Sequence, residues 1–507
     1  MALLSSEVTT QVAVVLLPLL VIYWLLYPWY FSPLRKVPGP WWAGYTKWWL
    51  FGHLRRSSVY KTWAGVRAKT IHELHLKYGP WVRVAPNEIS TSDSKAITAI
   101  YGVNSEFTKT EFYQYQLRGM TDAKPELFTT ADRKAHAKRR RELAHLFSMS
   151  TITEYEDIIQ RNVRECLDLI SAEGKEGKAS NLYDWWHYLS MDITCELCFG
   201  MGFDMLHKGA VNPYIKDMYG SLTIEPVRWH FGWLNRYASY APFKFIRDAE
   251  ACSVRGYQRG TKMVREYKLK ENKGRDKDLL QKMINARDEN GQPLPDEDLN
   301  VQSTSFILAG SHTTSSSLTW IVWRILKNPD IHRKLNEELD AALGTHDRKA
   351  VPPHAKLDNL TYLNCIIKEG LRIDTSVPGS TPRYVPPEGA AMGDYDLPRG
   401  TIVSVQAYTT HRDPDVFPDP DRFRPERWLD ETAEMRHLYI PFGADGPRKC
   451  IGIHLAYMEL RVILAALFHR FDLKFAGEVT DESMDMHELW LAAPVAQNLS
   501  VIATEKA

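Results

Sequence analysis

The sequence predicts a mainly α-helical body with small β-sheets, preceded by a single N-terminal transmembrane helix. Three observations support this fold class. Apolar residues recur at helical spacing over most of the chain. Runs that alternate apolar and polar residues are short and lie in surroundings rich in proline and glycine. The stretch Val12–Phe31 contains no charged residue, and about 20 such residues suffice to cross a bilayer as a helix.

The N-terminal part of the chain divides into three segments. Residues 1–11 are predicted to lie in the lumen, and residues 12–31 to form the transmembrane helix. Basic residues follow this helix but do not precede it, so the positive-inside bias places the body in the cytoplasm. We therefore expect a single-pass protein of the endoplasmic reticulum membrane. The prolines of residues 32–41 predict a stiff hinge before the body, residues 42–507.

The body is predicted to form one domain, because no repeat or linker-like stretch interrupts it. Periodicity predicts the positions of its main elements. Helices are expected over Lys61–Tyr78, Asp132–Ser148, Glu154–Ser171, Asp298–Leu326, Ile331–Leu343, Tyr362–Arg372 and Ile453–Phe471. Strands are expected over Trp81–Pro86 and Thr401–Ala407.

The composition argues against two classes of protein. Lys and Arg number 63 and Asp and Glu 62, a net charge of +1, whereas a nucleic-acid-binding protein usually has a strong basic excess. Six cysteines in 507 residues are too few for a disulfide scaffold. Cys195 and Cys198 form a CxxC pair without a second pair at usable spacing, which favours buried core cysteines over half of a zinc site.

One cysteine stands at the end of a loop rich in glycine and proline. The loop Pro441–Gly452 contains Cys450, and a long predicted helix follows it. Free backbone N–H groups and the positive end of the helix dipole stabilise a thiolate at such a position. A thiolate bound to haem iron favours cleavage of the O–O bond. For the loop alone, a buried structural cysteine beside a turn is the alternative.

This loop resembles the cysteine loop of the cytochrome P-450 family, whose pattern is FxxGxRxCxG. Gly446, Arg448, Cys450 and Gly452 match the pattern. Phe442 lies eight residues before Cys450, where the family usually has seven, so one residue is inserted. The resemblance covers the chain from roughly Lys36 to the C-terminus. It implies that Cys450 is the axial ligand of the iron of haem b, and that Phe442 and Arg448 contact the cofactor.

Two further motifs match the family in the same order. Glu369 and Arg372 are three residues apart on a predicted helix, so their side chains share a face and can pair. They match the family's ExxR motif. Pro425–Trp428 resembles its PERW motif, whose arginine, here Arg427, completes a Glu-Arg-Arg cluster in the family. The resemblance gives this cluster a structural role on the haem side.

The segment Ala309–Thr314 resembles the oxygen-activation segment of the family. The resemblance implies that Gly310 makes room for dioxygen and that Thr313 assists protonation. His312 stands where the family has an acid. Histidine has an ordinary pKa of about 6.5 and can carry a proton, so proton delivery by His312 is a hypothesis. The alternative for this segment is a Ser/Thr-rich helix face that bonds its own carbonyls.

The two propionates of a haem need cationic partners. His136 and Arg140 are four residues apart on a predicted helix and share a face. They resemble the pair that holds propionates in the family, and Arg383 and His411 resemble further ligands. The same helix carries other basic residues. The resemblance implies that they dock an acidic reductase, and a solvated basic face is the alternative.

The resemblance implies haem b, electrons from NADPH through an NADPH–cytochrome P-450 reductase, and insertion of one oxygen atom into an apolar small molecule. Residues 79–90 and 378–389 look like segments of filamentous-fungal enzymes, many of which act in secondary metabolism, so a polyketide, terpenoid or alkaloid substrate is expected. Substrate contacts are expected from Glu111–Leu127, Phe306, Ala309 and Trp490–Ala493.

Two other functions remain open from the sequence. A haem-thiolate isomerase or desaturase of the same type of pathway tolerates the change at His312. Dependence on NADPH and a reductase separates an isomerase from a monooxygenase. A non-catalytic membrane-anchored haem-binding protein also accounts for an axial cysteine, but it does not need Thr313 or the glycine near it.

Overall fold

The computed structural model describes the chain except for residues 1–5, 53, 57–62, 118–125, 225–227, 229–236, 238, 270–277, 288–290 and 489. For residues 6–13, 15, 17, 51, 52, 54–56, 63–65 and 115–117 it describes the backbone alone. Part of the predicted lumenal segment and part of the predicted substrate loop therefore lie outside the described residues.

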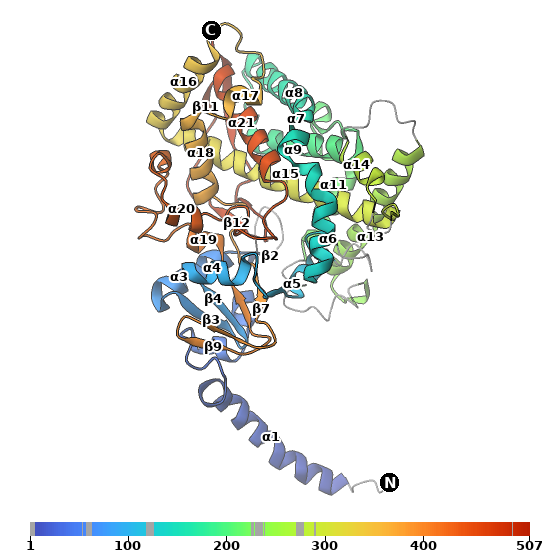
Figure 1. Ribbon diagram of the computed structural model, residues 1–507, viewed down its shortest axis with the longest axis vertical. Helices are drawn as coiled ribbons and strands as arrows, with labels where there is room; N and C mark the ends of the chain where they lie inside the picture. The colour runs from blue at the N-terminus through green and yellow to red at the C-terminus, as the bar shows by residue number, and fades with distance from the viewer. Residues whose placement is uncertain are drawn as a thin grey trace.

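Helices make up most of the body (Figure 1). The α-helices are α1 (Ser6–Tyr30), α2 (Trp48–Gly52), α3 (Arg67–Tyr78), α4 (Ser94–Tyr101), α5 (Phe112–Leu117), α6 (Arg133–Ala144), α7 (Met149–Glu154), α8 (Glu156–Lys175), α9 (Leu182–Phe199), α10 (Met205–Lys208), α11 (Pro213–Leu222), α13 (Lys244–Leu269), α14 (Leu279–Asn285), α15 (Asp296–Lys327), α16 (Pro329–Leu343), α17 (His354–Leu357), α18 (Thr361–Ile373), α19 (Ala407–Thr410), α20 (Ala433–Leu438) and α21 (Ile453–Arg470).

The strands are short and form several small sheets. They are β1 (Leu54–Arg56), β2 (Trp63–Gly65), β3 (Trp81–Ala85), β4 (Glu88–Thr91), β5 (Thr108–Lys109), β6 (Ser180–Asn181), β7 (Arg383–Tyr384), β8 (Ala390–Met392), β9 (Tyr395–Leu397), β10 (Ile402–Ser404), β11 (Phe471–Phe475), β12 (Met486–Glu488), β13 (Ala492–Pro494) and β14 (Ser500–Glu505). The predicted mainly helical body with small sheets is confirmed.

Helix α15 runs through the helical part of the body (Figure 1). Its first turn carries three acidic residues and its last turn two basic ones, which complements the helix dipole. It ends at Lys327, because Pro329 disfavours helical backbone in Asn328, the residue before it. Helices α9, α18 and α21 pack along it, and their apolar faces share one core with it.

The predicted helices are confirmed with small shifts of their ends, except that Lys61–Tyr78 is helical only from Arg67, because Trp63–Gly65 forms strand β2. For example, Asp298–Leu326 corresponds to α15 and Ile453–Phe471 to α21. The predicted strand Trp81–Pro86 is β3, whereas only the middle of Thr401–Ala407 is a strand. Helix α13 was not predicted.

The sheets join segments that are far apart along the chain. The five-stranded sheet has the order β3-β4-β10-β7-β5. Its edge pairing places Lys109 of β5 opposite Arg383 of β7. A four-stranded sheet has the order β1-β2-β12-β13, and β12 and β13 form a hairpin. These two sheets contribute the side chains of Lys109 and Arg383 and the tip of the β12–β13 hairpin to the candidate functional site.

Helix α1 leads away from the body on the side where β3 and β9 lie (Figure 1). The predicted transmembrane helix, residues 12–31, falls almost wholly within it. Within the described residues, no helix is both long enough and apolar enough to cross a membrane.

The C-terminal end of α1 is fastened to the body by side chains. The indole N–H of Trp29 donates to the hydroxyl of Tyr45 at 2.7 Å, and that hydroxyl donates to the carbonyl of Leu25 at 2.8 Å. Arg83 donates to the hydroxyl of Ser32 at 3.0 Å, and its backbone N–H donates to the carbonyl of Pro38. We call the contacts of Tyr45 with α1 the tyrosine bracket. Both the helix and the proline-rich segment after it are thereby held against the body.

Candidate functional site

Cys450 lies at the end of the loop that leads into α21. Its backbone N–H donates to the carbonyl of Phe442 at 2.9 Å, which closes the loop, and Gly452 caps the helix. The ring of Phe442 lies 5.3 Å from that of Tyr457 on α21. The loop with its extra residue thus retains a closed shape and holds Phe442 against the helix.

The thiol of Cys450 faces an interior space. Its side chain is accessible to solvent, yet burial raises the pKa of the thiol, so the sulfur lies within the molecule. Ala309 is likewise exposed in the middle of α15, although Ile307 and Ser311 beside it are fully buried. The solvent-accessible thiol of Cys450 and the opening at Ala309 in the largely buried helix α15 thus stand where the resemblance places a haem.

Several groups act on the pKa of Cys450 in opposite directions. Burial raises the pKa, and it outweighs the Gly452 N–H and the charges of Arg140 and Lys449, which lower it. The predicted helix terminus does favour the thiolate, but the neutral thiol prevails in the protein alone. Because a metal ligand must be a thiolate, binding of a metal would release a proton from Cys450.

Five basic side chains lie close together near this space. Burial and the charges of Arg448, Lys109, Arg140 and Arg383, in this order, lower the pKa of His136 to about 3. We call these five residues the cation group. Four of them were predicted as haem contacts, and the structure brings them together. Lys109 was missed, because only the pairing of β5 with β7 places it opposite Arg383.

Backbone carbonyls orient part of the cation group. Arg448 donates to the carbonyl of Thr130 and, at 2.8 Å, to that of Ala131. Arg140 donates to the carbonyl of Lys449 at 2.6 Å, beside Cys450. Arg448 therefore joins the cysteine loop to the loop before α6, and Arg140 joins it to α6 itself.

The cation group lacks enough negative charge of its own. Lys109 is fully enclosed and donates to the carbonyl of Phe128, and Arg383 donates to the hydroxyl of Tyr113. Burial, Arg383 and Arg448 together hold the pKa of Lys109 well below its usual range, and Glu126 opposes them only in part. Buried cations need anionic partners. The two propionates of a haem would meet this need, so the residues fit the cofactor that the cysteine loop implies.

His411 serves a different purpose from the one predicted. It is fully buried, and its Nε2 accepts the backbone N–H of Ile440 at 2.9 Å. Its Nδ1 lies 2.9 Å from the carbonyl of Arg372, to which it donates in that tautomer. Both ring nitrogens are occupied, so His411 cannot bind a propionate and instead joins α18 to the segment before the cysteine loop.

The structure brings the predicted Glu-Arg-Arg cluster together. Arg372 donates twice to the carboxylate of Glu369, each time at 2.9 Å, and Arg427 donates to it at 3.1 Å. The indole of Trp428 adds a bond of 3.0 Å. Burial alone would raise the pKa of Glu369, but the hydrogen bonds and charges of Arg372 and Arg427 lower it. The cluster ties α18 to the Pro425–Trp428 turn.

Thr313 faces the interior space, and Gly310 faces another helix. Thr313 is half-buried, and its hydroxyl donates to the carbonyl of Ala309 at 2.7 Å. A Cβ atom on Gly310 would lie 3.2 Å from the side chain of Thr194 on α9. The glycine therefore allows close packing of α9 on α15, which differs from the predicted role in making room for dioxygen.

His312 is neutral at neutral pH. Burial and then the nearby His487 lower its pKa to about 4, while a hydrogen bond to the backbone of Ala492 acts in the other direction. Its ring lies 5.9 Å from that of Tyr219. Unlike the acid that it replaces, His312 carries no charge and is bonded to strand β13.

A buried carboxyl group between α15 and α21 was missed by the sequence analysis. Glu459 accepts a hydrogen bond from Thr314 at 3.1 Å, and its other oxygen has no partner among the described residues. Burial raises its pKa to about 8. The sequence does carry a signal, since Glu459 is the one acidic residue of α21.

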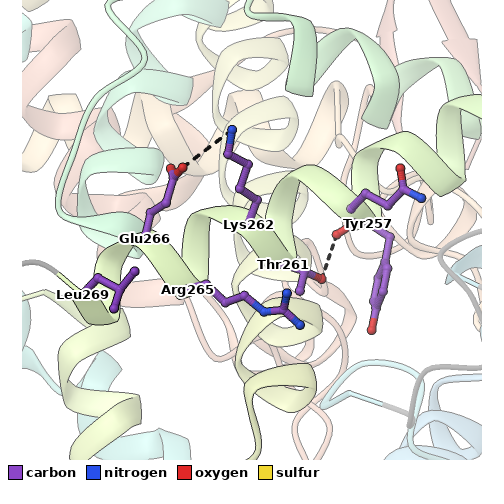
Figure 2. A pocket seen from close by; sticks show the side chains of 7 residues that line it. Tyr257, Thr261, Lys262, Arg265, Glu266 and Leu269 are labelled. Atoms are coloured by element: carbon purple, nitrogen blue, oxygen red, sulfur yellow. Dashed lines mark hydrogen bonds and ion pairs between the residues drawn. The ribbon is translucent and has the colours of Figure 1, made fainter.

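A cavity of about 380 Å³ on α13 is unrelated to this site (Figure 2). It is open to solvent, and its lining comes from one helix: Tyr257, Gln258, Thr261, Lys262, Arg265, Glu266 and Leu269. Lys262 and Glu266 pair with each other at 3.6 Å. None of the predicted site residues contributes to it.

The fold and the grouping of Cys450 with basic side chains are those expected for the cytochrome P-450 class of protein, and comparison with known proteins agrees. The family model for cytochrome P-450 matches residues 43–499. The chain therefore belongs to the cytochrome P-450 family, as a monooxygenase. It is 36% identical to the cytochrome P-450 monooxygenase tazI of Aspergillus terreus, over 96% of this chain and 97% of that protein.

Other relatives are also fungal proteins. The chain is 31% identical to the cytochrome P-450 monooxygenase stcB of Emericella nidulans, over 91% of this chain and 87% of that protein. It is 31% identical to the benzoate 4-monooxygenase bphA of Aspergillus niger, over 94% of this chain and 95% of that protein. The predicted resemblance to filamentous-fungal enzymes is confirmed.

Proposed function

We propose that the protein binds haem b with Cys450 as the axial ligand and inserts one atom of dioxygen into an apolar small molecule. The observation that carries this proposal is the interior-facing thiol of Cys450 close to Arg140 of the cation group. The haem, when bound, supplies the oxygen chemistry. Cys450 would hold the iron, and Arg140, Arg383, Arg448, His136 and Lys109 would hold the propionates.

A carbon-monoxide difference spectrum of the reduced, haem-supplemented protein tests this proposal. The wild type should show the strongly red-shifted Soret band of a thiolate-bound haem, and Cys450→Ser should lose it. Cys365→Ser is the matched control, because Cys365 is buried away from the cysteine loop on α18 and should keep the band. Absence of the band in the wild type, or its persistence in Cys450→Ser, would contradict the proposal.

Thr313 and His312 are proposed to act in proton delivery. This role is supported by the half-buried hydroxyl of Thr313 and by the place of His312 one residue before it. A neutral imidazole passes a proton by accepting one and releasing another, so its low pKa suits relay and not storage. His312→Ala should lower the yield of product per NADPH consumed, and an unchanged yield would remove His312 from the mechanism.

Electrons are proposed to come from NADPH through a reductase that docks on α6. The helix carries Arg133, Lys134 and Arg141 with exposed side chains, which suit an acidic partner. Arg133→Glu with Lys134→Glu should raise the KM for the reductase and weaken its dependence on salt. Retained reductase kinetics in this variant would favour a merely solvated basic face.

The substrate is proposed to be a secondary metabolite of the polyketide, terpenoid or alkaloid type. The fungal relatives support this, and one of them is named for action on benzoate. A haem-thiolate isomerase or desaturase is the second candidate, supported by the replacement of the usual acid by His312. An isomerase would turn over without NADPH, whereas the monooxygenase requires it.

The protein is also proposed to be held in the endoplasmic reticulum membrane by α1, with the body in the cytoplasm. Support comes from the uncharged residues 12–31 and from exposed apolar side chains such as Leu20, which is 61% exposed, and Val21. Alkaline carbonate extraction of cells that express the full chain tests this proposal. Release into the supernatant would contradict it, and protease protection of the body would reverse the topology.

A further inference from the structure

Three aromatic rings follow one another beside the proposed haem site. The ring of Trp490, at the tip of the β12–β13 hairpin, lies 5.2 Å from that of Phe128. The ring of Phe128 lies 5.4 Å from that of Tyr113 on α5. Tyr113 is buried, whereas Trp490 and Phe128 are only half-buried. We call these three residues the aromatic wall.

The Trp490 end of the aromatic wall is fixed next to Thr313 of α15. The backbone N–H of Ala492, two residues after Trp490, donates to the carbonyl of Ser376 at 2.9 Å. The hydroxyl of Ser376 in turn donates to the carbonyl of Thr313 at 3.0 Å. His312 bonds the backbone of Ala492 as well. The hairpin that carries Trp490 is thereby held against the residues proposed for proton delivery.

The other end of the aromatic wall, Tyr113, and its middle ring, Phe128, both reach the cation group, and Arg383 donates to the hydroxyl of Tyr113. Phe128 accepts a hydrogen bond from Lys109 through its carbonyl, and its backbone N–H donates to the carboxylate of Glu126 at 2.6 Å. Ser305, one turn before Ala309 on α15, donates to the same carboxylate at 3.2 Å. The aromatic wall therefore extends from the residues proposed for proton delivery to the cation group, which is proposed to hold the propionates. It passes beside the interior opening at Ala309.

Trp490 is held in this place at a cost to folding. Its φ of 101° lies in the region that favours glycine, and bulky residues rarely adopt it. Its indole N–H is buried and has no partner among the described residues. A glycine would avoid both costs. Strain of this kind is typical of residues that a ligand contacts, so packing alone does not account for the tryptophan.

We infer that Trp490 and Phe128 are specificity-determining residues that select substrates with a flat aromatic ring. Aromatic faces interact with one another in offset or tilted arrangements beyond what burial of apolar area gives, whereas a saturated ring gains only the burial. Trp490 and Phe128 are both only half-buried, so part of each ring is open to such a contact, while Lys109 lies over the Phe128 ring at 4.6 Å. This inference rests on the proposed function and adds the class of substrate.

Binding of two probes with the same carbon skeleton tests the inference. Naphthalene is flat and aromatic, and decalin is its saturated counterpart. Their apparent Kd values are measured on the haem-loaded full chain from the spin-state shift of the Soret band. Trp490→Leu and Phe128→Leu, which keep an apolar side chain but remove a ring, should each weaken naphthalene binding about ten-fold and change decalin binding less than two-fold.

Two controls separate the possible failures. Trp41→Leu removes an exposed tryptophan outside the aromatic wall and should leave both affinities unchanged. Trp490→Phe keeps an aromatic ring and should retain most of the preference for naphthalene, and it replaces Trp490→Leu if that variant does not take up haem. Equal losses for both probes, or no loss for either, would overturn the inference. The carbon-monoxide band of each variant reports on the proposed function separately, because it requires the thiolate-bound haem and not the aromatic wall.

Discussion

Glu369 and Arg372 lie one helical turn apart on α18 and share two hydrogen bonds of 2.9 Å, with no exposed side-chain surface on either residue. A buried ion pair of this kind contributes little net stability compared with apolar packing. Its loss is costly, however, because the remaining charge stays buried without its partner. Substitution of either residue should therefore destabilise the contact between α18 and the Pro425–Trp428 turn.

Glu369→Gln should lower the free energy of unfolding by about 3–5 kcal/mol, since it leaves two buried arginines without a carboxylate. Denaturant unfolding of the purified protein measures this. Glu426→Gln is the matched control, because Glu426 pairs with Lys334 at a partly exposed position and should cost less than about 1 kcal/mol. Similar losses in the two variants would show that burial of the cluster is not what matters.

Lys109→Met should have opposite effects on the protein without and with haem. Without haem, removal of an enclosed lysine relieves a buried charge, so the apoprotein should become more stable. With haem, one cationic partner of the propionates is lost, so haem should pass to apomyoglobin roughly ten-fold faster. The exposed Lys95→Met should change neither quantity. A holoprotein that keeps its haem as well as the wild type would exclude Lys109 from the haem contacts.

Glu459 should make the protein less stable as the pH rises. Its pKa is about 8 in the folded protein and about 4.5 when exposed. Between these values the folded state keeps a proton that the unfolded state has released, so stability falls from about pH 4.5 to about pH 8 and levels off above. Glu459→Gln should flatten this part of the Tm profile relative to the exposed Glu482→Gln. Parallel profiles for the two variants would contradict the raised pKa.

Tyr45→Phe should loosen the end of α1 without affecting the body. The change removes the hydroxyl that accepts from Trp29 and donates to Leu25, two hydrogen bonds worth about 1 kcal/mol each. Amide hydrogen exchange over residues 25–32 should therefore accelerate by about ten-fold or more. The thermal unfolding of the body should not change, and Tyr78→Phe should leave the exchange unaltered. Unchanged exchange in Tyr45→Phe would show that the tyrosine bracket does not hold the helix.

Local patterns in the sequence predicted much of the fold. The long helices α15 and α21 could be predicted because apolar periodicity extends over many turns. Their ends also have local causes, such as Pro329 at the end of α15. The small sheets could not be predicted in the same way, since β10 pairs with β4 and β5 with β7 across long stretches of chain. Pairing of this kind leaves no periodic signal in the sequence.

The candidate site likewise combines residues that local motifs predicted with residues that only the fold brings together. Cys450, Glu369 and Arg372 stand in contiguous motifs and were predicted directly. Lys109 was missed because its partners become neighbours only through the fold. His411 was misjudged because its sequence surroundings do not reveal that backbone groups occupy both ring nitrogens.

The pairing of β5 with β7 has a consequence for the order of assembly. Lys109 comes from the first quarter of the chain, Arg383 from its last third, and Cys450 later still. A polypeptide emerging from the ribosome cannot enclose the cofactor until nearly all of it has been made, because contacts between such distant segments form late. Uptake of haem is therefore a natural signal of completed biosynthesis, and truncated chains should accumulate as colourless protein.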